Sequence, residues 1–144
     1  MTDLKLLALD SEDLDVISAT TQDAVVRVSD MGFAQADHRF ALLMNRYAWE
    51  IGADNQRSKG QRKRAALHFD RVNGVQVAGI DLNAQQGVLE LLDIGFEAKD
   101  EPAGCIELRF AGGGTVRLDV ECIEARLQDL GAAWAAKAKP EHAP

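Results

Sequence analysis

The chain has 144 residues, 47% of them hydrophobic, and a formal net charge of −7. A chain of this length predicts one domain, because it can bury about two-thirds of its unfolded surface. The negative charge argues against general attraction to nucleic acid or to a membrane, both of which favour a basic surface. No apolar run approaches the roughly 20 residues that span a bilayer, and the acidic N-terminus lacks the pattern of a signal peptide, so we expect a cytoplasmic protein.

The N-terminal segment predicts a strand followed by a helix. Leu4 to Leu9 is a short apolar run, which we expect to form a strand buried on both faces. Asp10 is suited to cap a helix from Ser11 to Gln22, because the first turn of that segment is acidic. Leu14 and Ile17 would share its apolar face.

Two segments rich in β-branched and aromatic residues predict a hairpin. They are Ala24 to Ala34 and Arg39 to Ile51, and Gln35 to His38 supplies the turn between them. Along the second segment two apolar sets alternate, so neither face is fully polar: Phe40, Leu42 and Met44 on one side, and Leu43, Tyr47 and Trp49 on the other. Tyr47 and Trp49 could anchor an interface, although such residues more often pack in a core, here together with Trp134.

A polar segment from Gly52 to Lys63 predicts a long loop with a local excess of positive charge. Five of the chain's sixteen basic residues lie in eight positions: Arg57, Lys59, Arg62, Lys63 and Arg64. Such a segment is most often a solvated, flexible loop, and its functional interpretation is a contact for an acidic protein partner or for a second copy of the chain. Nucleic acid is the weaker candidate, because the segment has no aromatic residue on which bases could stack.

The middle of the chain predicts a second hairpin and a central strand. Ala65 to Val72 and Val75 to Ile80 flank Asn73 and Gly74, a pair typical of a type I′ turn. Val88 to Phe96 has apolar residues at both parities, which indicates a strand in the centre of a sheet or one that passes between layers.

The segment from Gly104 to Gly131 predicts a strand, a tight turn, a second strand and a closing helix. The two strands alternate clearly, with apolar residues on one face: Ile106, Leu108, Phe110, Val116, Leu118 and Val120. Gly112, Gly113 and Gly114 permit the positive φ of a short hairpin loop. Apolar residues then recur at helical spacing, at Val120, Ile123, Leu127 and Leu130.

Together these elements predict an α+β domain over residues 1–139, with a mobile tail over residues 140–144. We expect a strongly bent antiparallel sheet or a partly closed barrel of seven or eight strands, with one early helix and one C-terminal capping helix. Ala132 to Lys139 could extend that capping helix. The order of elements resembles the pleckstrin-homology architecture.

His68 and Asp70 form the one candidate reactive pair, because residues two apart on a strand project from the same face. A metal would need a third ligand, for which Glu90, Asp93 and His38 are candidates only if strand pairing brings one of them close. A satisfied histidine on the surface or at a sheet edge is the more common role. The sequence therefore predicts no metal site.

No other motif indicates catalysis or a cofactor. Cys105 and Cys122, the two cysteines, do not have zinc-binding spacing, and we expect both to be buried or half-buried free thiols. No serine lies in a nucleophile-elbow motif. An enzyme is the less favoured class, and no cofactor is predicted.

Several blocks of sequence resemble a known family. They are LKLLALDSEDLDVISA, QDAVVRVSDMGF, RFALLMNRYAWE, RAALHFDRV, GVLELLDIGFE, GGGTVRLDVECIEARLQDLGAAWA and KPEH. They look like an uncharacterised bacterial family, mainly alphaproteobacterial, classed as a domain of unknown function. The resemblance implies a cytoplasmic single-domain protein and carries no activity, cofactor or site residue with it.

These observations favour a non-catalytic interaction module that presents the basic loop and the Tyr47 and Trp49 strand to an acidic protein partner or to a second copy. One alternative is a small enzyme or ligand-binding protein that uses His68 and Asp70. Another is an RNA-associated factor.

Overall fold

The computed structural model describes residues 4–47 and 62–131, and in these ranges the fold is mostly β. One α-helix, α1 (Ser11–Thr20), and two 3₁₀ turns, η1 (Val28–Asp30) and η2 (Gln35–Asp37), occur in the described part. The ten strands there are β1 (Lys5–Ala8), β2 (Val25–Arg27), β3 (Met31–Ala34), β4 (Arg39–Tyr47), β5 (Arg62–Phe69), β6 (Val72–Ala78), β7 (Val88–Ala98), β8 (Gly104–Phe110), β9 (Thr115–Val120) and β10 (Ala125–Asp129).

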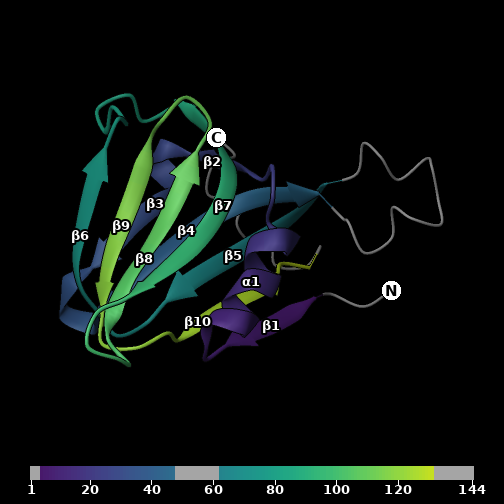
Figure 1. Ribbon diagram of the computed structural model, residues 1–144. Coiled ribbons are helices and arrows are strands. Elements are labelled where there is room, and N and C mark those ends of the chain that lie inside the picture. Colours follow the sequence, from purple (N-terminus) through teal and green to yellow (C-terminus); the bar gives the residue numbers. More distant parts are fainter. Residues whose placement is uncertain (1–3, 48–61, 132–144) are drawn as a thin grey trace.

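All ten strands belong to one antiparallel sheet with the order β1-β10-β5-β4-β2-β7-β8-β9-β6, and β3 pairs with β4 beside β2. The sheet bends so that β6, β9, β8 and β7 lie in front of β3, β4 and β5 (Figure 1). The short strand β2 joins the two halves, because Val25 pairs with both Asn45 of β4 and Glu90 of β7. Over the described residues the sheet does not close into a barrel, and β1 and β6 are its two ends.

A single hydrophobic core lies between the two halves and under α1. It includes Leu42 and Leu67 from one half, Ile106 and Leu118 from the other, and Ile17 from the helix. The helix lies against β1 and β7 and so covers one side of the bent sheet. Among the described residues no helix is long and apolar enough to cross a membrane.

Several expectations from local sequence are confirmed. The Asp10 side chain caps α1 by accepting a hydrogen bond from the Asp13 N–H at 2.8 Å. The β3–β4 hairpin forms around η2, although the segment before it divides into β2, η1 and β3. The β8–β9 hairpin turns at Gly112 and Gly113, whose φ angles are 90° and 97°. Cys105 is buried, Cys122 is half-buried, and both are free thiols.

The expected closing helix is wrong. Ala125–Asp129 forms strand β10, which pairs with β1 on one side and β5 on the other. Ala125, Leu127 and Asp129 are buried, whereas Arg126 and Gln128 are exposed, so burial repeats every two residues. The space between β1 and β5 needs a strand, and that tertiary requirement overrides the helical spacing of the apolar residues. No capping helix of the pleckstrin-homology kind forms at residues 120–131, and the class is mostly β rather than α+β.

The expected hairpin at Asn73 and Gly74 is also wrong, because β5 and β6 belong to different halves of the sheet and do not pair. The chain passes between the halves at Arg71, whose φ is 62°. Asn73 and Gly74 lie inside β6, where the pairing with β9 is irregular.

The first strand differs from the expectation in its burial. Leu4 to Leu9 was expected to be buried on both faces, but β1 is an edge strand, and Leu7 and Leu9 are 45% and 59% exposed. Strand alternation directs Leu7 to the outer face of the sheet, beside the exposed Arg126 of β10.

Some predicted features lie outside the described residues. They are Arg57, Lys59, Trp49, Trp134, the extension over residues 132–139 and the tail over residues 140–144.

Candidate functional site

The ladder between β4 and β5 presents a continuous row of side chains on the surface that faces away from the core. The register pairs Tyr47 with Arg62, Asn45 with Arg64, Leu43 with Ala66, and Ala41 with His68. These eight side chains are exposed or half-buried, whereas the intervening positions of β4, such as Leu42 and Met44, are buried. Asp70 follows β5 at the end of the row.

Basic side chains lie within this row and on both sides of it, and we call the surface the basic face. Its basic members come from β1, β4, β5 and β10: Lys5, Arg39, Arg62, Arg64 and Arg126. Two of them pair with carboxylates, Arg64 with Asp30 at 3.3 Å and Arg39 with Asp70 at 2.7 Å. Asp37 and Glu124 also interact electrostatically with Arg39, so the five basic side chains outnumber the acids near them by one, although the whole chain carries a net charge of −7.

Arg62 is fixed at one end of the basic face. Its guanidinium carbon lies 4.0 Å from the centroid of the Tyr47 ring, and it donates hydrogen bonds to the backbone carbonyl oxygens of Asn45 at 3.0 Å and Asp23 at 3.3 Å. Arg62, Lys63 and Arg64 were expected in or directly after a loop, but all three belong to β5. Strand alternation directs Lys63 to the other side of β5, so it is not part of this surface.

The middle of the basic face is hollow, with a volume of about 390 Å³. Its lining includes Gly32 from β3, Ala41 and Leu43 from β4, and Ala66 and His68 from β5. Glycine and alanine keep the floor low, because no long side chain rises from these positions. The hollow can therefore accept small or medium apolar side chains from another molecule.

His68 and Asp70 meet at the opposite end of the basic face from Arg62. The His68 Nε2 atom is 3.6 Å from one carboxylate oxygen of Asp70, whose other oxygen accepts a hydrogen bond from Arg39. Burial lowers the pKa of His68, and Arg39 and Arg126 lower it further, while Asp70 opposes the shift. The His68 ring is therefore neutral near pH 7 and lines the hollow as an uncharged group.

Acidification is expected to destabilise the protein in part through His68. Because the pKa of His68 in the folded protein is below the ordinary value of 6.5, the unfolded chain takes up this proton first as pH falls. The contribution of the neutral His68 ring to folding stability is present above pH 6.5 and is lost as the pH falls below this value. Urea unfolding at pH 7.5 and pH 5.0 should show a smaller loss of stability for His68→Gln than for the wild type. Equal losses would contradict this assignment.

The possible third ligands do not join His68 and Asp70. Asp93 pairs with Arg109, Glu90 is exposed, and the His38 Nδ1 atom lies 3.2 Å from the carbonyl oxygen of Val72. Across residues 4–47 and 62–131 no three His, Cys, Asp or Glu side chains form a group that could hold a metal ion.

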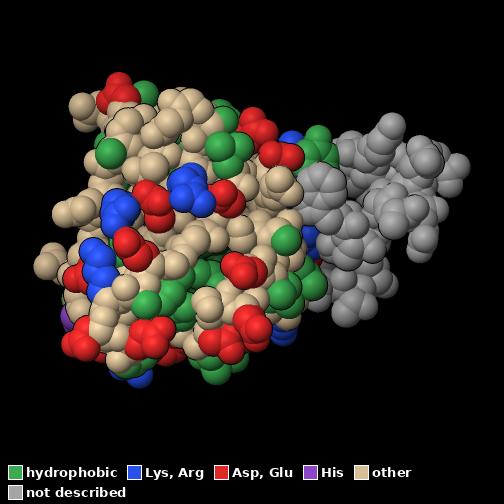
Figure 2. All heavy atoms as spheres, in the orientation of Figure 1, with side chains coloured by type: hydrophobic (Ala, Val, Ile, Leu, Met, Phe, Trp, Pro, Cys, Tyr) green, Lys and Arg blue, Asp and Glu red, His purple; other side chains and the backbone are tan. Residues whose placement is uncertain are grey.

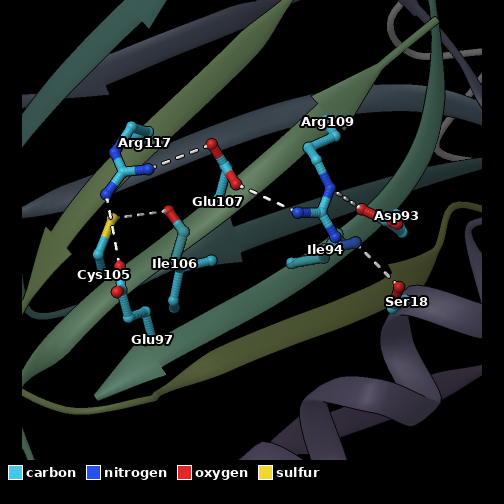
Figure 3. A network of polar contacts seen from close by, with 9 residues as sticks. All are labelled: Ser18, Asp93, Ile94, Glu97, Cys105, Ile106, Glu107, Arg109 and Arg117. Atoms are coloured by element: carbon cyan, nitrogen blue, oxygen red, sulfur yellow. Dashed lines mark hydrogen bonds and ion pairs between the residues drawn. The ribbon is translucent and has the colours of Figure 1, made fainter.

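The opposite outer face, on β7, β8 and β9, carries a charged network. Arg109 donates hydrogen bonds to Asp93 at 2.7 Å and to Glu107 at 3.3 Å, and Arg117 donates to Glu107 at 3.2 Å (Figure 3). Acidic and basic side chains are interspersed over the face seen in Figure 2. Alternating charges of this kind satisfy one another, so this face lacks the positive excess of the basic face.

A buried ion pair, which the sequence did not predict, lies on the inner side of the sheet. The Arg46 Nε and Nη2 atoms each donate to Asp129 at 2.8 Å, and the two side chains are 0% and 1% exposed. The Leu4 N–H also donates to Asp129, at 3.0 Å. Burial alone would raise the pKa of Asp129, but the hydrogen bonds from Arg46 and Leu4 hold it below its ordinary value. The alternation of β4 indicated this pair, since it places Arg46 on the same buried side as Leu42 and Met44.

Comparison with known proteins adds a family but no activity. A family model described as a protein of unknown function matches residues 4–142. No curated protein and no solved structure matches the sequence.

Proposed function

Because the chain belongs to the DUF2948 family of proteins, whose function is unknown, we propose its role from the structure of the basic face. The protein is a non-catalytic interaction module that binds an acidic, partly apolar segment of a partner protein. The family match shows a domain of unknown function that covers nearly the whole chain, and this is the part of the sequence resemblance that it tests. The partner that we propose is an acidic protein, as the sequence indicates, and the surface that we propose for it is the basic face of β4 and β5.

The combination of an apolar hollow with a basic border carries this proposal. The hollow offers Ala41, Leu43 and Ala66 to apolar side chains of the partner, and their burial would supply the affinity. Arg62 and Arg64 lie beyond one end of the hollow, and Arg126 neighbours His68 in the register at its other end. A segment that places apolar residues in the hollow and acids on either side fits this charge pattern.

The His68 and Asp70 pair supports the same role rather than a reaction. Arg39 hydrogen-bonds Asp70 and thereby holds the carboxylate in an ion pair. The neutral His68 ring then serves as one wall of the hollow, with ring nitrogens that can hydrogen-bond to a bound backbone.

The double variant Arg62→Ser/Arg64→Ser is expected to weaken binding of an acidic peptide about tenfold at low salt, since it removes two contacts of roughly 0.5 to 1 kcal/mol each. The peptide would be the most enriched sequence from a random twelve-residue display library, and we expect that sequence to be acidic with apolar residues. Fluorescence anisotropy with the labelled peptide measures the affinity, which should also fall as salt is raised.

The matched control is Arg109→Ser/Arg117→Ser, which makes the same change in net charge on the opposite face. It should leave peptide affinity unchanged, and thermal unfolding should show that both variants are folded. Equal weakening in the two variants, or enrichment of basic or neutral peptides, would contradict the proposed surface. Displacement of the peptide by an RNA oligonucleotide would instead favour the RNA-associated alternative.

A further inference from the structure

Strand β6 is an edge strand without a charged residue. It ends the sheet order, and its sequence is VNGVQVA. Past Val72, no described residue outside β9 forms a backbone hydrogen bond with the strand. Edge strands are commonly protected by charge, shortness or a bulge. Here β1 carries Lys5, and β3 has four residues between two 3₁₀ turns.

The protection of β6 is confined to its first residues. The irregularity in its pairing with β9 lies between Val72 and Gly74, so Gly74 to Ala78 continue as a regular strand. Alternate residues of such a strand direct their N–H and C=O groups towards the free edge. This regular part has neither a proline nor a charge that would prevent another strand from pairing with it.

We propose that two copies of the chain associate through antiparallel pairing of their β6 strands, centred on Gln76. In this register Gly74 faces Ala78, Val75 faces Val77, and Gln76 faces its own equivalent. Every position thus meets a side chain of similar size or the same type, and the two-fold symmetry repeats each contact on the other side of Gln76. The front halves of the two copies would become one continuous eight-stranded sheet, four strands from each.

Apolar surface on the inner side of β6 supports this pairing. Val75 and Val77 are only half-buried at the margin of the core, as are Met31 and Phe33 of the other edge strand, β3. A second copy beside β6 would extend the apolar face at this margin and remove more of Val75 and Val77 from water. Paired valines on adjacent strands are also a favourable cross-strand combination.

The charges near β6 are compatible with a second copy. Gln76 pairs in register with Arg117 of β9, and Arg117 is held by Glu107. The two Arg117 residues of a dimer would be three strand spacings apart, roughly 14 Å, which is beyond direct contact. At longer range two chains of net charge −7 repel each other, so salt should strengthen the dimer. Peptide binding at the basic face should respond to salt in the opposite direction.

Sedimentation velocity over a range of protein concentrations and at two salt concentrations tests this inference. The wild type should pass from monomer to dimer, at lower protein concentration when salt is high. Gln76→Glu places two like charges opposite each other at the symmetry axis and should weaken the dimer about fivefold. The matched control Gln128→Glu adds the same charge at an exposed position of β10 and should not weaken it.

The possible results separate clearly. Weakening by Gln76→Glu alone, together with slower amide hydrogen exchange of residues 74–78 in the wild-type dimer, supports the interface. A wild type that stays monomeric overturns it and leaves the edge to a strand of another protein. Equal dimer strength in the wild type and Gln76→Glu, or equal weakening by both variants, also overturns it. The basic face is not altered by Gln76→Glu, so failure here leaves the peptide-binding proposal intact.

Discussion

Replacing Asp129 by asparagine is expected to lower the free energy of unfolding by about 3–5 kcal/mol, because it removes the carboxylate of the buried ion pair with the Arg46 guanidinium. Two hydrogen bonds of 2.8 Å join these groups, and neither side chain has meaningful contact with water. Asparagine keeps the size of the side chain, so the loss reports charge rather than volume. Urea unfolding of Asp129→Asn and wild type at pH 7 measures the difference.

Two further variants identify the cause. Asp93→Asn breaks a well-exposed ion pair that has one hydrogen bond, from Arg109 at 2.7 Å, and it should cost less than about 1 kcal/mol. The double variant Arg46→Met/Asp129→Leu removes both buried charges and should be more stable than Asp129→Asn. If Asp129→Asn and Asp93→Asn cost the same, the inner pair is not the buried ion pair described above.

Ala125→Glu is expected to cost at least about 4 kcal/mol, because it introduces an unpaired carboxylate into the core. Ala125 is fully buried in β10, between Ala8 of β1 and Phe69 of β5. In a helix with Val120, Ile123, Leu127 and Leu130 on its apolar side, Ala125 would lie away from that side. The substitution therefore tests both the assignment of β10 as a strand and the burial of Ala125. Chemical denaturation measures the loss in free energy of unfolding.

The control is again Gln128→Glu, three residues further along β10 on its exposed face, which should change stability by less than about 0.5 kcal/mol. Should Ala125→Glu fail to fold, Ala125→Leu should still fold and lose about 1–3 kcal/mol by overpacking. A stable Ala125→Glu protein would contradict the burial of this position in β10.

Features that depend on neighbouring residues could be predicted from the sequence. The Asp10 cap needs only the next turn of helix, and the β8–β9 hairpin needs only its alternation and two glycines with positive φ. Features that depend on distant partners could not. Leu127 fits a helical and an alternating pattern equally well, and only its position between Leu6 and Leu67 selects the strand.

The candidate surface also depends on residues that are distant in the sequence, so it could be predicted only in part. The sequence places Tyr47 and Arg62 in one possible site and His68 with Asp70 in another. The register of β4 with β5 brings Tyr47, Arg62 and His68 onto one face, and Asp70 lies beside His68. The residues could be chosen from their chemistry. Their combination, and the low floor made by Ala41 and Ala66, depend on pairing that a single sequence does not reveal.

The position of β10 also constrains the order in which the molecule is assembled during its synthesis. β1 leaves the ribosome before the other described strands of this sheet, yet its sheet partner is β10, so Lys5 cannot pair until Gln128 has been synthesised. β5 likewise keeps one edge open until β10 emerges. Such distant pairing carries a high contact order and slows folding. The half built from β6 to β9 pairs sooner, because β7, β8 and β9 form successive hairpins.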